Sequence, residues 1–125
     1  MISIVIFEDN KVLRQSLTLY FNNTEGIYLA GAYEDANEAV AKIRKHRPDV
    51  VLMDIQMPGM SGVETTQRVR AEFPEQKLPI IALTANAMKG DELEYLAAGM
   101  NACLTKPIQM QTLALTLQEW CPMAG

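Results

Sequence analysis

The sequence predicts an α/β fold, with one domain over residues 1–125 built on a doubly wound, five-stranded parallel sheet that has helices on both faces. The chain has 125 residues, of which 49% are apolar, and this suits one compact core. Five short apolar runs alternate along the chain with five stretches of helical periodicity. Because parallel strands need crossovers and are buried on both faces, this alternation indicates a parallel sheet.

Three apolar runs in the first half of the chain predict strands, at residues 2–7, 27–33 and 50–53. Between them, apolar residues recur at helical spacing, namely Leu13, Leu17, Tyr20 and Phe21, and then Ala36, Ala39, Val40 and Ile43. Either Asp9 or Asn10 can cap the first helix. Asp35 is the expected cap of the second helix, which stops before Pro48.

The second half of the chain predicts three helices and two strands. A helix from about Gly62 to Phe73 follows a proline–glycine loop. The fourth and fifth strands are expected at residues 79–83 and 102–104. The helix between them is expected to bury one face, formed by Leu93, Leu96, Ala97 and Met100. The last helix aligns Met110, Leu113, Leu117 and Trp120.

Charge and composition exclude several function classes. Fifteen acidic residues against eleven Lys and Arg give a net charge of −4, so we expect no nucleic acid contact by this domain. No apolar run approaches the roughly 20 residues that span a bilayer, and no basic leader precedes the first run, so we expect a cytoplasmic protein without membrane contact. Cys103 and Cys121 lack metal-ligand spacing and are expected as buried or partly buried thiols. His46 lies at a predicted helix end, with no expected catalytic role.

Polar side chains stand at the ends of four of the five predicted strands. Glu8 and Asp9 follow the first strand, Asp54 follows the third, Thr84 ends the fourth and Lys106 follows the fifth. In open parallel sheets, ligands bind at the carboxyl ends of the strands, where the strand order reverses. If the strand order is 2-1-3-4-5, the strands that carry these residues are adjacent and the second strand lies at the edge. We therefore expect the five side chains at one rim of the sheet.

The residue types at this rim suit phosphoryl transfer. Three carboxylates repel one another unless a cation or a proton intervenes. Oxygen ligands favour magnesium, manganese or calcium over zinc, and magnesium takes one or two carboxylates while keeping waters for a phosphate substrate. A carboxylate can also attack phosphorus and form an aspartyl phosphate, while a metal and a lysine stabilise the charge on the transferring oxygens.

Four segments at these positions resemble those of a known family. They are the acidic pair Glu8–Asp9, the stretch MDIQMPGMSG around Asp54, the segment IIALTA with Thr84, and the TKP segment with Lys106. Together they resemble the receiver domain of two-component response regulators, and the resemblance covers nearly the whole chain. It implies a CheY-like, flavodoxin-like (βα)5 fold in the strand order 2-1-3-4-5. It also implies a phosphorylation-dependent signalling switch in a phosphorelay.

The resemblance implies a role for each residue at the rim. Asp54 is the implied phosphoacceptor, which takes a phosphoryl group from a sensor histidine kinase or a histidine phosphotransfer protein. The implied Mg²⁺ ligands are Asp9 and Asp54 through their carboxylates, Glu8 through a water, and Gln56 through its backbone carbonyl. Lys106 pairs with the phosphoryl group, and Thr84 donates a hydrogen bond to it and so reports its presence. The peptide bond Lys106–Pro107 is expected to be cis. Such a protein catalyses only its own phosphorylation and dephosphorylation.

One switch position departs from the family pattern. Three residues before Lys106, many receiver domains carry an aromatic residue that turns inward when the threonine moves toward the phosphate, but this chain has Cys103. The two orientations of a small thiol differ little in exposed area. We therefore expect output to depend more on displacement of the loop after the fourth strand and of the helix over residues 88–98. Because Gln56 and Asn86 are neutral, we predict no fast hydrolysis of the phosphoryl group.

Two other functions remain open at the level of the sequence. A phosphatase of the haloacid dehalogenase type also forms an aspartyl phosphate, but it needs a second aspartate two residues on, where this chain has Gln56. A receiver-like module that only binds a partner, unphosphorylated, needs no metal cluster. For the switch, the expected output surface is formed by the fourth helix, the fifth strand and the fifth helix. An output domain or a downstream protein is the expected partner there.

Overall fold

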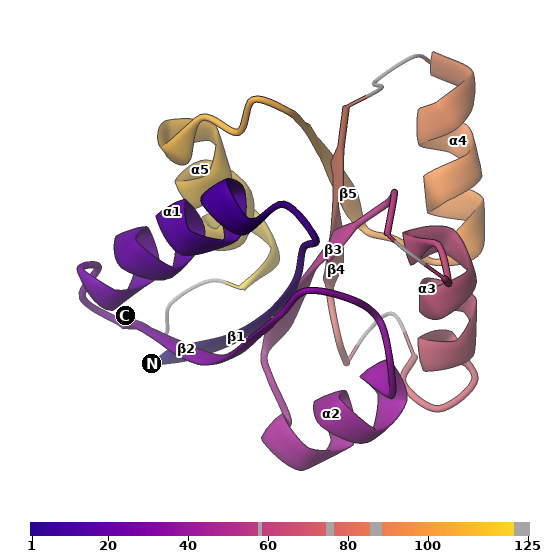
Figure 1. Ribbon diagram of the computed structural model, residues 1–125, viewed down its shortest axis with the longest axis horizontal. Helices are drawn as coiled ribbons and strands as arrows, with labels where there is room; N and C mark the ends of the chain where they lie inside the picture. Colours follow the sequence, from indigo (N-terminus) through magenta and orange to yellow (C-terminus); the bar gives the residue numbers. More distant parts are fainter. Residues whose placement is uncertain (58, 75–76, 86–88, 122–125) are drawn as a thin grey trace.

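The computed structural model describes residues 1–57, 59–74, 77–85 and 89–121. In this part of the chain, five parallel strands form one sheet in the order β2-β1-β3-β4-β5, which confirms the predicted topology (Figure 1). The strands are β1 (Ile2–Phe7), β2 (Ile27–Tyr33), β3 (Val50–Asp54), β4 (Ile80–Thr84) and β5 (Ala102–Thr105). The helices are α1 (Lys11–Asn22), α2 (Ala39–His46), α3 (Gly62–Arg70), α4 (Lys89–Ala98) and α5 (Met110–Trp120).

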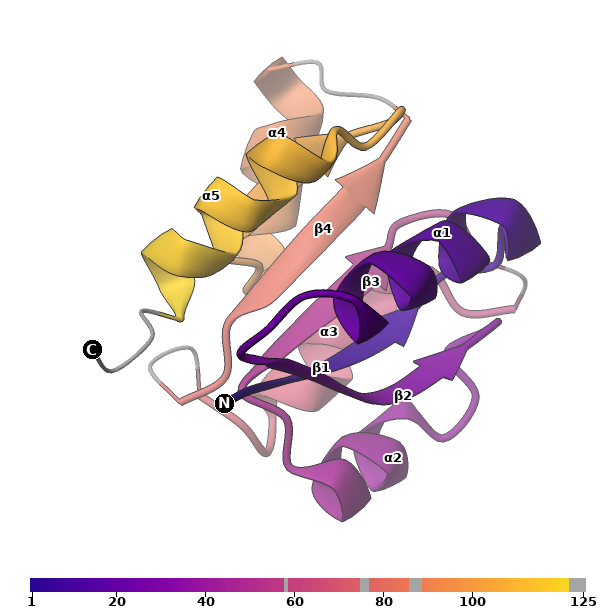
Figure 2. The ribbon, with the colours of Figure 1, turned by 90° about the vertical axis from the view of Figure 1, so that its left-hand side faces the viewer.

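Helices cover both faces of the sheet. Figure 2 shows α1 and α5 in front of the sheet, with α3 and α4 behind it, on the same face as α2. Each face has its own apolar cluster. Ile4 and Ile6 of β1 pack with α1 and α5, whereas Val5 and Phe7 pack with the other three helices. Since both faces of the central strands are buried, these strands read in the sequence as apolar runs without alternation.

The strand register brings the carboxyl ends of neighbouring strands to one level. Phe7 of β1 pairs with Met53 of β3. The residues that follow them, Glu8 and Asp54, therefore lie side by side at the carboxyl ends of the two strands. Thr84 of β4 pairs with Thr105 of β5, and the Thr84 carbonyl accepts a hydrogen bond of 2.7 Å from the backbone N–H of Lys106. The bond from Lys106 to Pro107 is cis, as the family resemblance implied.

Helix ends differ from the sequence predictions at two places. Asn10 is the cap of α1, with its Oδ1 accepting a 3.0 Å hydrogen bond from the N–H of Leu13. The expected Asp35 cap of α2 is wrong, because the Asp35 carboxylate instead accepts from the N–H of Asn37 and forms a turn before the helix. Helix α3 ends at Arg70, short of Phe73, because Pro74 disfavours helical backbone at the residue before it.

The buried face of α4 also differs from the predicted one. Leu93 and Leu96 are 66% and 43% exposed, and Ala97 is exposed as well. Tyr95 and Ala98, three residues apart, face the core instead, and only Met100 of the predicted set is buried. In α5 the prediction is confirmed, because Leu113 and Leu117 are buried, with Met110 and Trp120 half-buried.

The two cysteines and His46 lie in the surroundings that the sequence predicts for them. Cys103 and Cys121 are free and half-buried, and burial, followed by the nearby Asp49 carboxylate, raises the pKa of the Cys121 thiol to about 11. His46 ends α2, where its Nε2 lies 2.5 Å from the hydroxyl of Tyr33. In the described part of the chain, every helix is too short or too polar to span a membrane.

Candidate functional site

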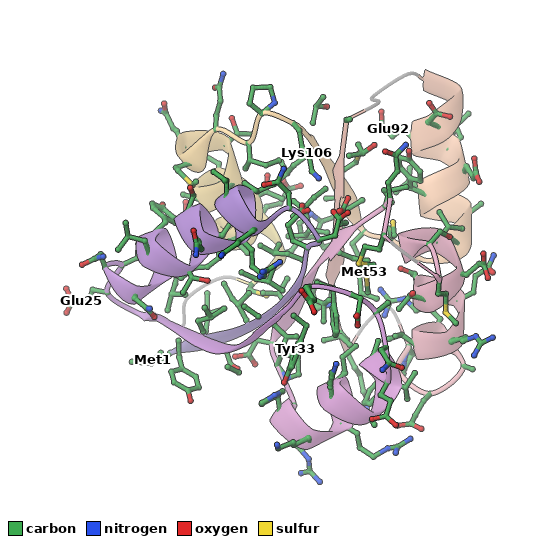
Figure 3. The ribbon with its side chains drawn as sticks, viewed as in Figure 1. Met1, Glu25, Tyr33, Met53, Glu92 and Lys106 are labelled. Carbon is green, nitrogen blue, oxygen red and sulfur yellow. The ribbon has the colours of Figure 1, made fainter. Side chains whose placement is uncertain are left out.

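The carboxyl-terminal rim of the sheet gathers the five side chains that the sequence singled out. Glu8 and Asp9 lie in the loop after β1, and Asp54 and Thr84 end β3 and β4. Figure 3 shows Lys106 above Met53 of β3, at this end of the sheet. From β1 the chain first adds β2 on one side and then β3 on the other, so the strand order reverses at β1. Open α/β sheets bind their ligands at the carboxyl ends of the strands next to such a reversal.

Three carboxylates form a compact acidic cluster at the rim. One carboxylate oxygen from each of Glu8, Asp9 and Asp54 lies within 4.8 Å of the other two. Glu8 is fully buried and Asp54 is 2% exposed, whereas Asp9 is exposed to solvent. The cluster therefore has one side open to water and two carboxylates held in the protein interior.

Lys106 supplies a cation on the inner side of this cluster. Its Nζ lies 2.9 Å from Glu8 Oε1 and 3.2 Å from Asp54 Oδ1. Burial disfavours the lysine charge, but the two carboxylates outweigh this effect and raise the pKa of Lys106 above its ordinary value. The lysine is therefore charged at neutral pH, and its ammonium group faces a cluster of three carboxyl groups.

The proton balance of the cluster follows from this excess of acid. Burial raises the pKa of Asp54 to about 8, and the neighbouring Asp9 and Glu8 carboxylates, which stabilise its protonated form, act in the same direction. The pKa of Asp9 is lowered, because protonated Asp54 can donate a hydrogen bond to it. In the absence of a bound metal ion, Asp9 and Asp54 therefore share one proton near neutral pH.

Backbone groups orient the two buried carboxylates. The N–H of Gln56 donates to Asp54 Oδ1 at 3.2 Å, and the N–H of Asn10 donates to Glu8 Oε2 at 2.9 Å. Asp54 Oδ2 is buried without a hydrogen-bond partner, and Glu8 Oε1 has the Lys106 ion pair but no hydrogen bond. Buried oxygens in this state are available to a ligand. An all-oxygen donor set of this kind fits a hard divalent cation such as Mg²⁺.

Thr84 lies beside this cluster at the end of β4. Its side chain is 3% exposed, and its Oγ1 is 3.2 Å from the hydroxyl of Tyr95 on α4. The rim thus combines a buried acid, a cation and a hydroxyl, which together can accept a group that carries several anionic oxygens.

A comparison with protein-family models shows which family has these residues at the rim of such a sheet. The model of the response regulator receiver domain matches residues 4–118, a range that includes all five rim residues. The chain belongs to the receiver-domain family. Receiver domains are modules of two-component signalling, where they generally act as switches rather than as turnover enzymes.

Two curated relatives of this receiver domain are proteins of different kinds. The chain is 36% identical over 123 residues to the polar-differentiation response regulator DivK of Brucella anthropi, and the match covers 94% of each chain. It is 42% identical over 96 residues to the sensor protein GacS of Pseudomonas syringae pv. syringae, a match that covers 74% of this chain and 11% of GacS. Receiver domains like this one therefore occur both in small response regulators and within sensor proteins.

Solved structures agree with the fold. The receiver domain of sensor histidine kinase PA1611 from Pseudomonas aeruginosa PAO1 is 36% identical, with a TM-score of 0.80 and coverage of 95% of this chain and 96% of that one. That structure has a magnesium ion coordinated in its active site cleft. A LuxR-family DNA-binding response regulator from Staphylococcus aureus has a TM-score of 0.85 at 23% identity, covering 96% and 98% of the two chains, and this likeness concerns the fold alone.

The structure adds two residues to the receiver site that the sequence analysis missed. Arg14 of α1 donates to the backbone carbonyls of Glu8 at 2.8 Å and Asp9 at 3.4 Å, and so holds the loop that carries both carboxylates. A basic residue near the start of a helix opposes the helix dipole, and this could have marked Arg14 as a residue with another role. Tyr95 carried no such signal, because its position opposite Thr84 depends on the rotation of α4.

The departing switch position lies outside the acidic cluster. Cys103 of β5 is half-buried against the apolar cluster beneath α4. Burial and the nearby Glu92 carboxylate of α4 raise the pKa of its thiol, so the side chain is an uncharged, small group at neutral pH. Asn86, whose neutral side chain was with that of Gln56 the basis for expecting no fast hydrolysis, lies outside the described residues.

Proposed function

We propose that residues 1–125 form a single receiver domain that accepts a phosphoryl group onto Asp54. The donor is a phosphohistidine of a sensor histidine kinase or of a histidine phosphotransfer protein. The observation that carries this proposal is the state of one carboxylate. Asp54 is 2% exposed, its Oδ1 is held by Lys106 and the Gln56 N–H, and its Oδ2 has no hydrogen-bond partner. A buried, oriented carboxylate with a free oxygen is suited to act as a nucleophile.

The proposed reaction moves a phosphoryl group from a histidine nitrogen to the carboxylate of Asp54 in one displacement. An oxygen of the Asp54 carboxylate attacks phosphorus, the bond between phosphorus and the histidine nitrogen breaks, and its electron pair stays on the imidazole. The product is an acyl phosphate on Asp54. In this proposal Lys106, whose Nζ is 3.2 Å from Asp54 Oδ1, balances the charge of the phosphoryl oxygens, and the Thr84 hydroxyl at the end of the neighbouring strand donates a hydrogen bond to one of them.

The acidic cluster is the proposed Mg²⁺ site. Asp9 and Asp54 are ligands through their carboxylates, Glu8 acts through a coordinated water, and Gln56 contributes its backbone carbonyl. Three observations support this assignment: the spacing of the three carboxylates, the buried Asp54 oxygen without a partner, and the magnesium ion in the related receiver of PA1611. When bound, Mg²⁺ neutralises the charge that the carboxylates and the phosphoryl oxygens bring together.

The proposed switch has an input edge and an output surface. Thr84 responds to the phosphoryl group, and the surface of α4, β5 and α5 passes the change to an output domain or a downstream protein. This role includes no turnover of other substrates, since the domain catalyses only its own phosphorylation and dephosphorylation. We assign it to the cytoplasm, because the free, half-buried Cys103 and Cys121 suit a reducing compartment.

The test is phosphorylation of the purified domain by acetyl phosphate with Mg²⁺. Intact-mass analysis is expected to show a gain of one phosphoryl group, which Asp54→Asn abolishes. Asp49→Asn is the matched control, because Asp49 precedes the opposite end of β3, where its carboxylate accepts a hydrogen bond from the backbone N–H of Ser3. A mass gain that persists in Asp54→Asn, or its absence in the wild type, contradicts the proposal. Turnover of a small phosphomonoester contradicts the self-limited role and favours a phosphatase.

A further inference from the structure

We propose that Tyr95 couples Thr84 to α4, so that the phosphorylation state of the site changes the position of that helix. This role rests on the proposed phosphorylation of Asp54. It assigns to a residue of α4 the reporting function that an aromatic residue on β5 has in many receiver domains. The described residues provide four independent reasons for it.

The first reason is a direct contact between two buried hydroxyls. Tyr95 is 7% exposed and Thr84 is 3% exposed, and their hydroxyl oxygens are 3.2 Å apart. The ring of Tyr95 belongs to the apolar cluster that α2, α3 and α4 form on the sheet. Tyr95 therefore links the end of β4, inside the site, to a helix that forms part of the outer surface.

The second reason is the number of hydrogens available. Each hydroxyl has one hydrogen to donate and can also accept, so the bond between Thr84 and Tyr95 can run in either direction. Once the Thr84 hydroxyl donates to a phosphoryl oxygen, it can only accept a hydrogen bond from Tyr95, and it can do so only while its oxygen stays within reach of the tyrosine hydroxyl. A rotation of Thr84 toward Asp54 then breaks the contact and leaves a buried tyrosine hydroxyl unpaired. An unpaired buried hydroxyl is unfavourable, and a shift of α4 relieves it.

The third reason is how α4 is attached to the rest of the molecule. Among its side chains that the structure describes, residues 91–98, only Tyr95 and Ala98 are buried. The chain just after the helix is held firmly, because Arg70 donates to the Gly99 carbonyl and to Asn101 Oδ1, each at 2.8 Å. A change at Tyr95 therefore moves the part of α4 ahead of it about a fixed carboxyl end.

The fourth reason is the side chain at the usual reporter position. Cys103 is too small to expose or bury much area by changing rotamer, and it packs against the same cluster as Tyr95. The helix that Tyr95 anchors also presents Leu93 and Leu96, which are 66% and 43% exposed. A displacement of α4 thus changes the position of an apolar surface that a partner protein can bind.

The test compares wild type with Tyr95→Phe, which keeps the ring and removes the hydroxyl. Hydrogen exchange of the amides from Glu92 to Ala98 is measured with and without saturating beryllofluoride and Mg²⁺, the stand-in for a phosphoryl group. We expect the unliganded variant to exchange about two- to tenfold faster than wild type over these residues, as for the loss of one hydrogen bond. We expect beryllofluoride to change exchange in α4 of the wild type and to change it little further in the variant.

Two control variants isolate the hydroxyl contact. Tyr28→Phe removes a hydroxyl from an exposed tyrosine on β2, and it is expected to leave exchange in α4 and its response to beryllofluoride as in the wild type. Cys103→Ala is expected to keep the response as well. An equal response in Tyr95→Phe and wild type overturns the proposal, even if the melting temperature of the variant falls. So does a response that Cys103→Ala abolishes.

The outcome for the proposed function is read separately, from the mass of the same samples treated with acetyl phosphate. If Asp54 of the wild type takes no phosphoryl group, the proposed function and the role of Tyr95 both fall. If wild type and Tyr95→Phe both take it and α4 responds equally in the two proteins, only the role of Tyr95 falls.

Discussion

The ammonium group of Lys106 lies 3.2 Å from Oδ1 of Asp54, a carboxylate that is 2% exposed. The two residues are 52 positions apart in the sequence and meet because β3 and β5 end at the same rim of the sheet. Among the described residues, Lys106 is the lysine that forms ion pairs with the carboxylates of the cluster, so removal of either the lysine or a carboxylate charge has a measurable consequence.

Loss of the lysine charge is expected to weaken both stability and phosphorylation. Lys106→Met leaves the buried Glu8 and Asp54 without their cation, which we expect to lower the free energy of unfolding at pH 7 by about 1 to 3 kcal/mol. The rate of phosphorylation by acetyl phosphate should fall by roughly a hundredfold, because a donor to the transferring oxygens is gone. Urea denaturation and the rate of mass gain measure the two effects. Lys45→Met, on the exposed end of α2, should change neither quantity, and equal effects in both variants would contradict the prediction.

Loss of the Asp54 charge is expected to stabilise the metal-free protein. The pKa of Asp54, about 8, lies above the ordinary value of 3.8, so the folded state prefers the protonated acid. This contribution is complete below about pH 4 and is lost as the pH rises through about 8. In EDTA at pH 8, Asp54→Asn should therefore be more stable than the wild type by about 1 to 3 kcal/mol. Urea denaturation should show this difference shrinking toward pH 4, and a variant of lower stability at pH 8 refutes the prediction.

Divalent cations are expected to stabilise the folded wild type. Mg²⁺ at about ten times its dissociation constant should add about 1.4 kcal/mol to the free energy of unfolding, and EDTA should remove this gain. Asp9→Asn, which removes the exposed carboxylate of the cluster, should lose most of it. Asp91→Asn on α4 is the matched control and should keep the gain. Thermal melts over a series of Mg²⁺ concentrations measure the effect, and parallel shifts in wild type and Asp9→Asn would exclude the cluster as the site.

A methyl group at Gly62 is expected to distort the loop after Asp54. An added Cβ would lie 2.2 Å from the backbone carbonyl oxygen of Asp54 and 3.0 Å from the Cα of Ile55, neither of which can move freely. Gly62→Ala should therefore lower the free energy of unfolding by about 1 to 3 kcal/mol and also slow phosphorylation, because Asp54 itself is displaced. Gln67→Ala, on the exposed side of the same helix, should affect neither. Normal phosphorylation in a destabilised Gly62→Ala protein would show that the loop adapts without moving Asp54.

The site residues could be predicted because each depends on a strand end. An apolar run without alternation marks a strand buried on both faces, and the polar residue that follows it must lie at the rim of a parallel sheet. Glu8, Asp9, Asp54, Thr84 and Lys106 all met this condition, and the structure brings them together. The family resemblance, now confirmed over residues 4–118, supplied the chemistry of the roles we propose for them.

Helix faces and helix ends were predicted less well, because they depend on contacts with distant residues. The leucines of α4 share one helical face in the sequence, yet Leu93 and Leu96 are exposed and Tyr95 is buried. Asp35 has a capping side chain, but it forms a turn before α2 instead. For α4, the buried face is set by packing of Tyr95 into the apolar cluster on the sheet. For Asp35, a side chain that can cap a helix can equally form a turn with the backbone two residues on.

The sequence, with the family resemblance that it carries, determined the sheet, its crossovers and the rim at which the acidic residues meet, because apolar runs and their order along the chain can be recognised locally. Only the tertiary structure decided which oxygens of that rim have partners, and which residue of α4 reaches Thr84. The partners of the rim oxygens come from Lys106 and from backbone N–H groups of the loops after β1 and β3. The contact with Thr84 depends on the rotation of α4 about its axis, which is set where Arg70 holds the chain at Gly99 and where Tyr95 enters the core. No local pattern in the sequence of the helix encodes that rotation.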